Sequence, residues 1–430
     1  MRFYNFLKHL NSQRKKKVHR VLFLILSFSL TLSFAQDDRL RLKQADVLEN
    51  ITVDGKSIQY LRGNVIFHKG DKVMNCEWAR FDQKTEQGFL FGNVSMVEDV
   101  QNLTCDSLFV DSPKDIMIAY SNTHVWDTTY SLVADTLFYF SELDSGSANG
   151  NTTLIQDKQT IKGDRIEYFE IPESDGVSYA ARGNVSITEE GRLATCGEAI
   201  YDRKNGKTTL RFKPKILDNN QTIAGSEIFL EYDEDVLKSL FIPSNAHATH
   251  PSTGLRQWME IVDEDTLTFE DSLSFTDDMT GSILRGFFTD GLMDSMRLEG
   301  MATTLYHIFE DSVYQGKNEA SGDTIILNFS ENDLQKIFVT GGSRGIYTPD
   351  STGADVDGPI HYESEDIDYD VVNEFTDLHG EAVIDYTNIN LTAGFINVAW
   401  QNNLLKALTE SPKDSSYGWI RPSMVENGED

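Results

Sequence analysis

Short runs of alternating apolar and polar residues fill the chain from about residue 45 onward, and they recur at a fixed interval. Three of these runs share nearly the same letters: "LRGNVIF" at 61–67, "LFGNVSM" at 90–96 and "ARGNVSI" at 181–187. Alternation with a period of two is the pattern of a β-strand with one buried face. Many runs of Val, Ile, Phe, Tyr and Thr, and only nine prolines, also favour strands.

When the repeats are aligned, small residues occupy one equivalent position, which we call the small-residue column. Most of them are followed by an acid, and their spacing gives the length of the repeat. The members of the column are Cys76, Cys105, Ala134, Gly163, Cys196 and Gly225, at spacings of 29, 29, 29, 33 and 29, and then Gly281, Gly322, Ser364 and Ala393. Such a period is typical of repeat proteins, in which each unit buries its apolar face only against its neighbours. The sequence therefore predicts an all-β fold, a repetitive solenoid of about ten two-strand repeats.

Four apolar columns keep their place relative to the small residue, and the alternation puts them on the inner face. They lie eleven, nine and two residues before the small residue and five residues after it. The resulting interior set is Val65, Phe67, Met74, Phe81, Val94, Met96, Leu103, Val110, Val125, Leu132, Tyr139, Leu154, Ile161, Tyr168, Ile187 and Tyr201. Just after the small residue the alternation breaks, which predicts a bulge or corner there. The repeated Gly-Asn pair is expected to mark the turn at which the chain re-enters the stack, because both residues tolerate left-handed backbone.

The first 35 residues have the pattern of a secretory signal peptide. A basic stretch up to Arg20 precedes the apolar run "VLFLILSFSLTLSFA", which ends in a small-x-small site at Ala35. This run is shorter than the roughly 20 apolar residues of a membrane-spanning helix. We therefore expect cleavage after Ala35 and export of the rest of the chain.

Composition divides the rest of the chain. Residues 36–250 hold the regular repeats, whereas an acidic stretch, "VDEDTLTFEDSLSFTDD", and a loop rich in Gly and Asp at 341–359 make 251–410 a second, looser repeat region. Residues 411–430 are expected to be an incomplete repeat or a disordered tail, with poor order from about 408 onward. Either the chain is a fragment of a longer protein, or its last strand edge is open to a partner domain that adds strands to it.

The net charge of −30, from 68 acidic and 38 basic residues, removes one class of function. A nucleic-acid-binding protein needs a basic track along the phosphates, so no nucleic-acid partner is expected. Candidate chemistry is sparse. His247 and His250 form the only close histidine pair, but a zinc site needs three or four ligands, so we expect neither metal nor cofactor. Acidic pairs such as Glu365 and Asp366 could act as glycosidase carboxylates, although a solvated face is the favoured interpretation.

All three cysteines fall in the small-residue column, which favours packing over catalysis. Cys76 and Cys105 are one period apart, so the sequence predicts that they are neighbours on adjacent rungs, within the Cα separation that a disulfide allows. An exported compartment permits oxidation. Strand neighbours that face the same way often have poor bridge geometry, so free thiols are favoured and a disulfide is the alternative.

Together, the repeats resemble the OstA/LptA family, the periplasmic lipopolysaccharide-transport β-jellyroll that is also found as the N-terminal domain of LptD. The resemblance is carried by "GNV" followed by a small residue, an acid, and hydrophobic and aromatic positions, in copies beginning at Gly63 and Gly92. The copy beginning at Gly183 has Gly197 where the acid should be. The segments "LEGMATTLYHI" (298–308) and "ASGDTIILNF" (320–329) resemble later repeats, and the resemblance covers roughly 45–245 and 280–400.

The resemblance implies that the repeats form a twisted β-jellyroll in the periplasm, with an association with the outer membrane left open. The interior of such a jellyroll holds lipid acyl chains, and its open ends stack with neighbouring domains of the same kind. Under it, the sixteen interior residues become candidates for a lipid trough, with a dry core as the alternative. The implied function is non-enzymatic transport of lipopolysaccharide, or a similar glycolipid, toward the outer membrane. The implied partners are that glycolipid, other Lpt-type jellyroll domains joined by end-to-end strand addition, and the outer-membrane assembly. A secreted β-helix enzyme acting on polysaccharide and a structural or adhesive β-solenoid remain as alternatives.

Overall fold

The computed structural model describes residues 39–426 with short gaps, at 54–55, 141–144, 157, 171–176, 190, 203, 219–220, 234–235, 263–264, 311, 332, 351–357 and 400–403. The predicted signal peptide therefore lies outside the described residues. The chain forms two compact units, which divide between Phe212 and Lys213. They are named here the N-terminal unit (described from 39 to 212) and the C-terminal unit (213 to 426).

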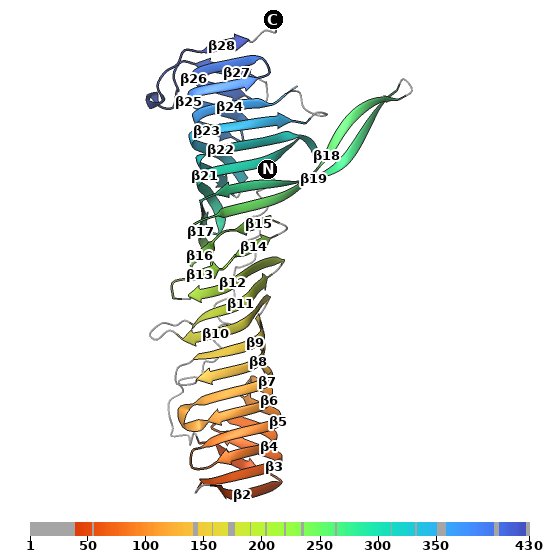
Figure 1. Ribbon diagram of the computed structural model, residues 1–430, viewed down its shortest axis with the longest axis vertical. Coiled ribbons are helices and arrows are strands. Elements are labelled where there is room, and N and C mark those ends of the chain that lie inside the picture. Colours follow the sequence, from red (N-terminus) through yellow and green to blue (C-terminus); the bar gives the residue numbers. More distant parts are fainter. Residues whose placement is uncertain are drawn as a thin grey trace. The chain divides into compact units, whose positions relative to one another are not determined.

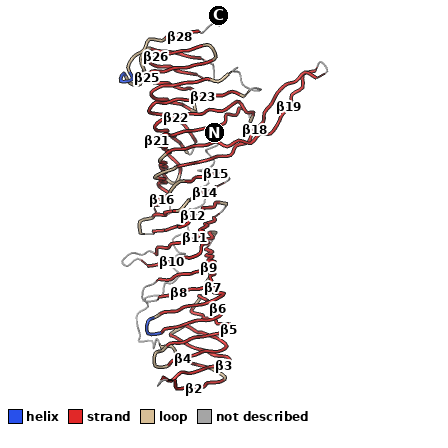
Figure 2. The backbone as a smooth tube through the Cα atoms, in the orientation of Figure 1, coloured by secondary structure: helices blue, strands red, loops and turns tan. Residues whose placement is uncertain are grey.

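Both units are built from β-strands, as Figures 1 and 2 show, which confirms the predicted fold class. The described residues contain no α-helix, only the short 3₁₀ turns η3 (Ser112–Lys114) and η6 (Ser415–Tyr417). Within that part of the chain, no helix is long and apolar enough to cross a membrane.

The strands of the N-terminal unit form one antiparallel meander in which β1 and β2 both pair with β3, and each later strand pairs with the next. They are β1 (Arg41–Gln44), β2 (Val47–Val53), β3 (Lys56–Lys69), β4 (Lys72–Asp82), β5 (Gln87–Glu98), β6 (Gln101–Asp111), β7 (Ile116–Trp126), β8 (Tyr130–Phe140), β9 (Ser145–Gln156), β10 (Gln159–Glu170), β11 (Val177–Glu189), β12 (Arg192–Asp202) and β13 (Lys207–Arg211).

The strands of the C-terminal unit begin in shorter pieces and then form a second meander from β20 to β26. They are β14 (Lys215–Asp218), β15 (Gln221–Ala224), β16 (Glu227–Asp233), β17 (Val236–Ile242), β18 (Ala246–Val262), β19 (Asp265–Gly281), β20 (Ile283–Thr289), β21 (Leu292–Glu310), β22 (Val313–Ser330), β23 (Asp333–Pro349), β24 (Ile360–Asp370), β25 (Phe375–Tyr386), β26 (Ile389–Ala399), β27 (Leu404–Leu408) and β28 (Ser423–Glu426).

The Gly-Asn pair bends a strand in its middle and does not end it. In β3, Gly63 and Asn64 have φ angles of 74° and 47°, and the pairing register with β4 shifts between Arg62 and Val65. Equivalent shifts recur in β5, β7 and β11. Two left-handed residues thus form a bulge that turns the strand while its ladder continues on both sides. The predicted corner is confirmed, but the expectation that Gly-Asn marks the turn between strands is wrong. That turn lies at Gly70 and Asp71, between β3 and β4.

An acid that lies earlier in the chain holds the corner, either from the bend before β2, as with Asp46, or from the preceding strand, as with Asp106. Asn64 Nδ2 donates to Asp46 Oδ2 over 2.9 Å, and Asn122 Nδ2 donates to Asp106 Oδ2 over 2.8 Å. The same acid packs over the glycine, because a Cβ added at Gly92 would lie only 2.5 Å from a carboxylate oxygen of Glu77. Glycine is therefore required at the corner for two reasons, its left-handed backbone and the space that the acid fills.

The change of composition near residue 250, at which the sequence predicts a domain boundary, coincides instead with a long hairpin of β18 and β19. The units divide earlier, at Phe212 and Lys213, where both residues have positive φ angles of 62° and 59°. From Arg256 outward, the two strands pair only with each other among the described residues. Figure 1 shows this arm projecting away from the other strands of the C-terminal unit.

Residues 404–426 include two short strands, and the expectation of poor order from about 408 stays a prediction. The short strands β27 and β28 pair side by side along β26. Between them, Tyr417 donates from its hydroxyl to Asp366 Oδ2 over 2.6 Å, and its ring stacks on that of His379 with centroids 5.4 Å apart. These contacts place the segment against β24 and β25.

The corner generates a stability prediction that separates its two requirements. Gly92 and Gly191 both have positive φ, of 76° and 86°, but nothing lies within 4 Å of a Cβ added at Gly191. We expect Gly191→Ala to lower the free energy of unfolding by about 1–2 kcal/mol, the cost of left-handed backbone. Gly92→Ala should cost roughly 1–3 kcal/mol more, because its Cβ overlaps Glu77. Denaturant unfolding of the full chain measures both, and equal losses would show that the acid does not constrain the corner.

Candidate functional site

The bends fold the N-terminal unit into two walls that face each other across an apolar interior. Wall A is the hairpin between one Gly-Asn corner and the next small residue, for example residues 64–76. Wall B is the remainder of each strand pair, for example 58–62 with 78–82. Phe67 of wall A meets Phe81 of wall B edge to face, with ring centroids 5.5 Å apart. The interior is therefore formed by inward-facing side chains of both walls.

None of the sixteen predicted interior residues is exposed. Eleven are buried, and these are Val65, Phe67, Met74, Phe81, Val94, Leu103, Val110, Leu132, Tyr139, Leu154 and Ile161. The other five are half-buried, and these are Met96, Val125, Tyr168, Ile187 and Tyr201. The half-buried members begin at β5, so the interior becomes less tightly covered beyond the first strands.

Around β3 and β4 the interior is filled and its opening is bridged. Phe67 and Met74 have no exposed surface. Leu40, just before β1, is buried as well and lies against Gly88 of wall B. Across the opening, Lys69 at the free end of wall A forms an ion pair with Asp115, which follows η3 at the free end of wall B. This end of the interior is closed by side chains of the unit itself.

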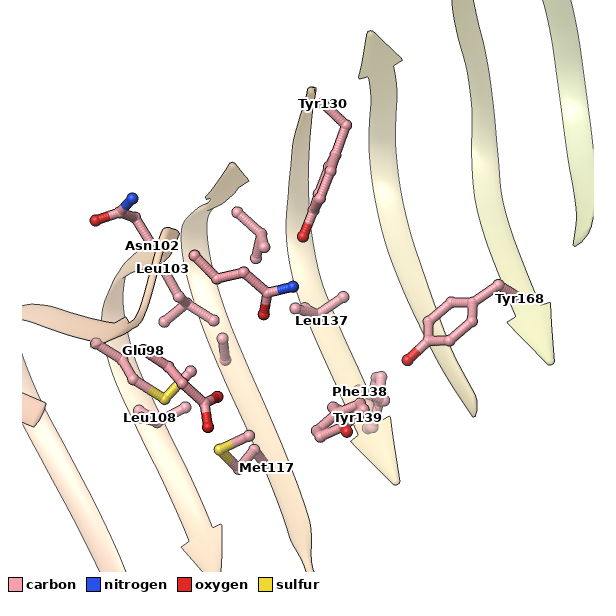
Figure 3. A pocket seen from close by; sticks show the side chains of 14 residues that line it. Glu98, Asn102, Leu103, Leu108, Met117, Tyr130, Leu137, Phe138, Tyr139 and Tyr168 are labelled. Carbon is pink, nitrogen blue, oxygen red and sulfur yellow. The ribbon is translucent and has the colours of Figure 1, made fainter. Parts of the chain in front are cut away.

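Further along, from β5 to β10, a cavity of about 50 Å³ lies between the walls (Figure 3). Its lining combines apolar side chains of both walls with polar groups near the opening. The residues are Met96, Glu98, Gln101, Asn102, Leu103, Leu108, Met117, Ala119, Val125, Tyr130, Leu137, Phe138, Tyr139 and Tyr168. The Tyr168 ring has room there because its strand partner is Gly146, where a Cβ would lie 2.5 Å from that ring.

A polar rim borders the opening of the interior along wall A. It consists of the last inward-facing residue on each side of every wall A hairpin, seven and four residues before the small residue. The pairs are Lys69/Lys72, Glu98/Gln101, Asp127/Tyr130, Gln156/Gln159 and Glu189/Arg192. Three cations and three anions balance, so the rim offers hydrogen bonds without a strong net charge.

Comparison with known proteins relates the repeats to a known family. The family model described as "LptA/(LptD N-terminal domain) LPS transport protein" matches residues 74–236. The chain contains a domain of the LptA/LptD N-terminal family. Among the solved structures that match is LptH, "the LptA homologous periplasmic component of the conserved lipopolysaccharide transport device from Pseudomonas aeruginosa". It is 15% identical, and the match covers 33% of this chain and 88% of that chain with a TM-score of 0.26. No curated protein matches the sequence.

The interior of this LptA/LptD-type domain contains both predicted and unpredicted residues. Five of the sixteen predicted residues line the cavity: Met96, Leu103, Val125, Tyr139 and Tyr168. Sequence reasoning missed the polar rim, because polar columns were assigned to the outside. The signal was available, since positions seven and four before the small residue have the same parity as the inward columns.

The histidine pair does not converge on a shared site. His247 contacts Asp278 through Nε2 over 2.6 Å, whereas His250, on the opposite face of β18, lies 3.5 Å from Asp277. His307 also binds Asp277, over 2.8 Å. Burial alone would raise the pKa of Asp277, but the hydrogen bonds from His250 and His307 hold that pKa below its ordinary value. Within the described part of the chain, no group of three or more candidate ligands is arranged to hold a metal ion.

The three cysteines of the LptA/LptD-type domain are free and buried. Cys76 and Cys105 lie on β4 and β6, which are both neighbours of β5. The expectation that they sit on adjacent rungs is wrong, because each repeat supplies two strands and one period spans about 9.6 Å. That separation exceeds what a disulfide allows. Burial raises the pKa of Cys76 and of Cys196 to about 11, and that of Cys105 to about 12.

These raised thiol pKa values predict an alkaline loss of stability. In the unfolded chain the thiols release their protons near their ordinary pKa of 9.0, whereas the folded domain keeps them protonated to about 11. Above pH 9 the unfolded state therefore binds fewer protons than the folded state. The contribution of the thiols to the free energy of unfolding is complete below that pH and is lost as the pH rises toward 11–12. Replacing all three cysteines by Ala, the residue at position 134 of the same column, should reduce the loss between about pH 8 and about pH 10.5. Unfolding free energies that fall equally in both proteins would refute this origin.

Proposed function

We propose that this chain is a non-enzymatic, periplasmic carrier that shields the acyl chains of lipopolysaccharide, or of a similar glycolipid, between its two walls and passes the lipid toward the outer membrane. The observation that carries the proposal is the apolar cavity that opens at a polar rim. The family assignment of residues 74–236 supports the choice of ligand. The interior offers apolar surface and the rim offers paired hydrogen-bonding groups, an arrangement suited to binding.

The physical task of such a carrier matches this layout. An amphipathic lipid crossing water needs apolar surroundings for its chains, and each buried methylene contributes about 0.8 kcal/mol. Its head group needs to stay hydrated. Met96 and Leu103 can contact a chain inside the cavity, while Glu98 and Gln101 at the rim lie beside the position of the head. One hairpin thus presents both kinds of contact within a few residues.

Binding of an acyl chain requires side chains of the two walls to move apart and enlarge the cavity. The cavity of about 50 Å³ is far smaller than the roughly 300–1,000 Å³ of a typical ligand pocket. Met96 and Met117 line it, and methionine side chains are flexible enough to be displaced by an incoming chain. In contrast, the end near β3 is held shut by Leu40 and by the ion pair of Lys69 with Asp115. We infer that chains enter at the β5–β10 region.

We also propose that neighbouring jellyroll domains join this chain by strand addition, as part of an assembly that reaches the outer membrane. The outer edges of β2 and of β28 have no strand partner among the described residues. Both carry exposed apolar side chains, including Leu48 on β2 and Met424 on β28, which are 50% and 68% exposed. Unpaired apolar edges are the surfaces to which another chain adds a strand.

The carrier function predicts that a charge inside the cavity reduces lipid capture more than the same charge outside it. Met96→Asp places a carboxylate among apolar side chains, a costly burial. We expect glycolipid that co-purifies with the full chain, measured by mass spectrometry, to fall by about tenfold or more. Ser95→Asp is the matched control, because Ser95 faces the opposite side of β5 and its hydroxyl accepts from Asn75 over 3.4 Å. Equal effects of the two substitutions would refute the proposal.

The assembly proposal predicts association that rises with protein concentration in light scattering. Leu48→Lys or Met424→Lys should each reduce it, because a lysine at a strand edge opposes pairing with another chain. Val372→Lys is the control, since Val372 is 61% exposed but lies in the turn between β24 and β25. All three substitutions change the net charge equally. A strictly monomeric wild-type chain at high concentration, or equal effects of all three, would contradict end-to-end assembly.

A further inference from the structure

Tyr130 places a hydroxyl group at the cavity between the walls. It is the first residue of β8 and a member of the polar rim, yet only 4% of its surface is exposed. Its hydroxyl oxygen is buried and has no hydrogen-bond partner among the described residues. Figure 3 shows the ring extending from the rim so that the oxygen points inward, toward the level of Leu137 on wall B.

The position of Tyr130 is fixed by the turn before it. Asp127 Oδ1 accepts hydrogen bonds from the backbone N–H groups of Thr129 and Tyr130, over 2.6 and 3.0 Å, and from the Thr129 hydroxyl over 2.7 Å. The backbone N–H of Asp127 donates in turn to the carbonyl of Tyr130. The start of β8 is therefore held firmly, and the ring is directed into the cavity by a rigid hairpin end.

A buried hydroxyl without a partner is costly, because it has lost its hydrogen bonds to water and gained none in return. Burial and the nearby carboxylate of Asp127 raise the pKa of Tyr130 above its ordinary value, so the group stays protonated and neutral. Its hydrogen-bonding capacity is therefore that of one donor and an acceptor. The lining of the cavity combines apolar side chains, such as Leu103, Val125 and Leu137, with polar ones at Glu98, Gln101 and Asn102. None of these side chains forms a hydrogen bond with the Tyr130 hydroxyl.

From this geometry we propose that the Tyr130 hydroxyl is a specificity-determining group that binds a hydroxyl substituent on an acyl chain in the cavity. The inference rests on the proposed carrier function and adds to it a class of preferred ligand, hydroxylated rather than plain acyl chains. The hydroxyl lies inside the rim, so the matching group belongs to the chain itself and not to the linkage that joins chain and head. Because Tyr130 starts at the rim, that group lies within a few carbons of the polar end of the chain.

The experiment compares two probes that differ by one hydroxyl, 3-hydroxytetradecanoic acid and tetradecanoic acid, in binding to the full chain by displacement of a fluorescent fatty acid. Wild-type protein should bind the hydroxylated chain about fivefold more tightly, the ratio expected from one neutral hydrogen bond. Tyr130→Phe should abolish this preference by weakening the binding of the hydroxylated chain until its affinity equals that of tetradecanoic acid. Tyr120→Phe is the control, because Tyr120 is 38% exposed and outside the lining of the cavity, and it should keep the preference.

The outcomes separate this inference from the carrier function. If both chains bind wild-type protein equally, or if Tyr130→Phe weakens both equally, the carrier function stands and the role of Tyr130 is refuted. If neither chain binds, both fail.

Stability provides an independent readout. Removing a hydroxyl that lacks a protein partner should leave the denaturation midpoint of Tyr130→Phe equal to or above that of the wild type. A loss as large as that of an intramolecular hydrogen bond would show that the hydroxyl is already satisfied within the protein, and would overturn the proposal.

Discussion

The architecture of the N-terminal unit depends on bending every strand at the same place without breaking the hydrogen-bond ladder between strands. A bend that drifted from strand to strand would separate the two walls or leave buried backbone groups unpaired. The Gly-Asn bulge solves this locally, and an acid that lies earlier in the chain aligns the corner with its neighbour through Asn Nδ2. The small residues Cys76, Cys105 and Ala134 occupy the inside of the bend. The distance between the walls, the continuity of the interior and the position of the rim all depend on this alignment of the corners.

The same alignment produces the gradation along the interior. Near β3 and β4, large side chains, Leu40 and the bridging ion pair of Lys69 with Asp115 fill and close the space. From β5 onward, methionines and half-buried aromatic residues replace them, and a cavity opens. One repeat pattern therefore supports both a filled, closed end and a region with a cavity, because the backbone is constant and only side-chain volume changes.

Periodicity predicted the fold class and the inward columns well, because burial on one face of a strand leaves a direct mark on the sequence. Prediction from periodicity failed where one sequence pattern is compatible with two structures. Left-handed Gly-Asn is expected both at turns and at bulges, so Gly63 and Asn64 were assigned to the wrong one. The period counts two strands, so the separation of Cys76 and Cys105 was underestimated. The rim was missed because residues such as Tyr130 and Gln101 are polar yet face inward, and polarity was read as exposure.

The spacings also show where the chain tolerates a change of length. From the corner Asn to the next small residue the count is twelve in every repeat from Asn64 to Cys196. From the small residue to the next Asn it is seventeen, except between Gly163 and Asn184, where it is twenty-one. Even there the corner survives, since Asn184 still donates to Asp164. Wall A hairpins thus have a fixed length, so the rim residues stay at the same distance from the corner in every repeat. Wall B, in contrast, tolerates insertions. A peptide tag or reporter grafted into this unit belongs on the wall B side.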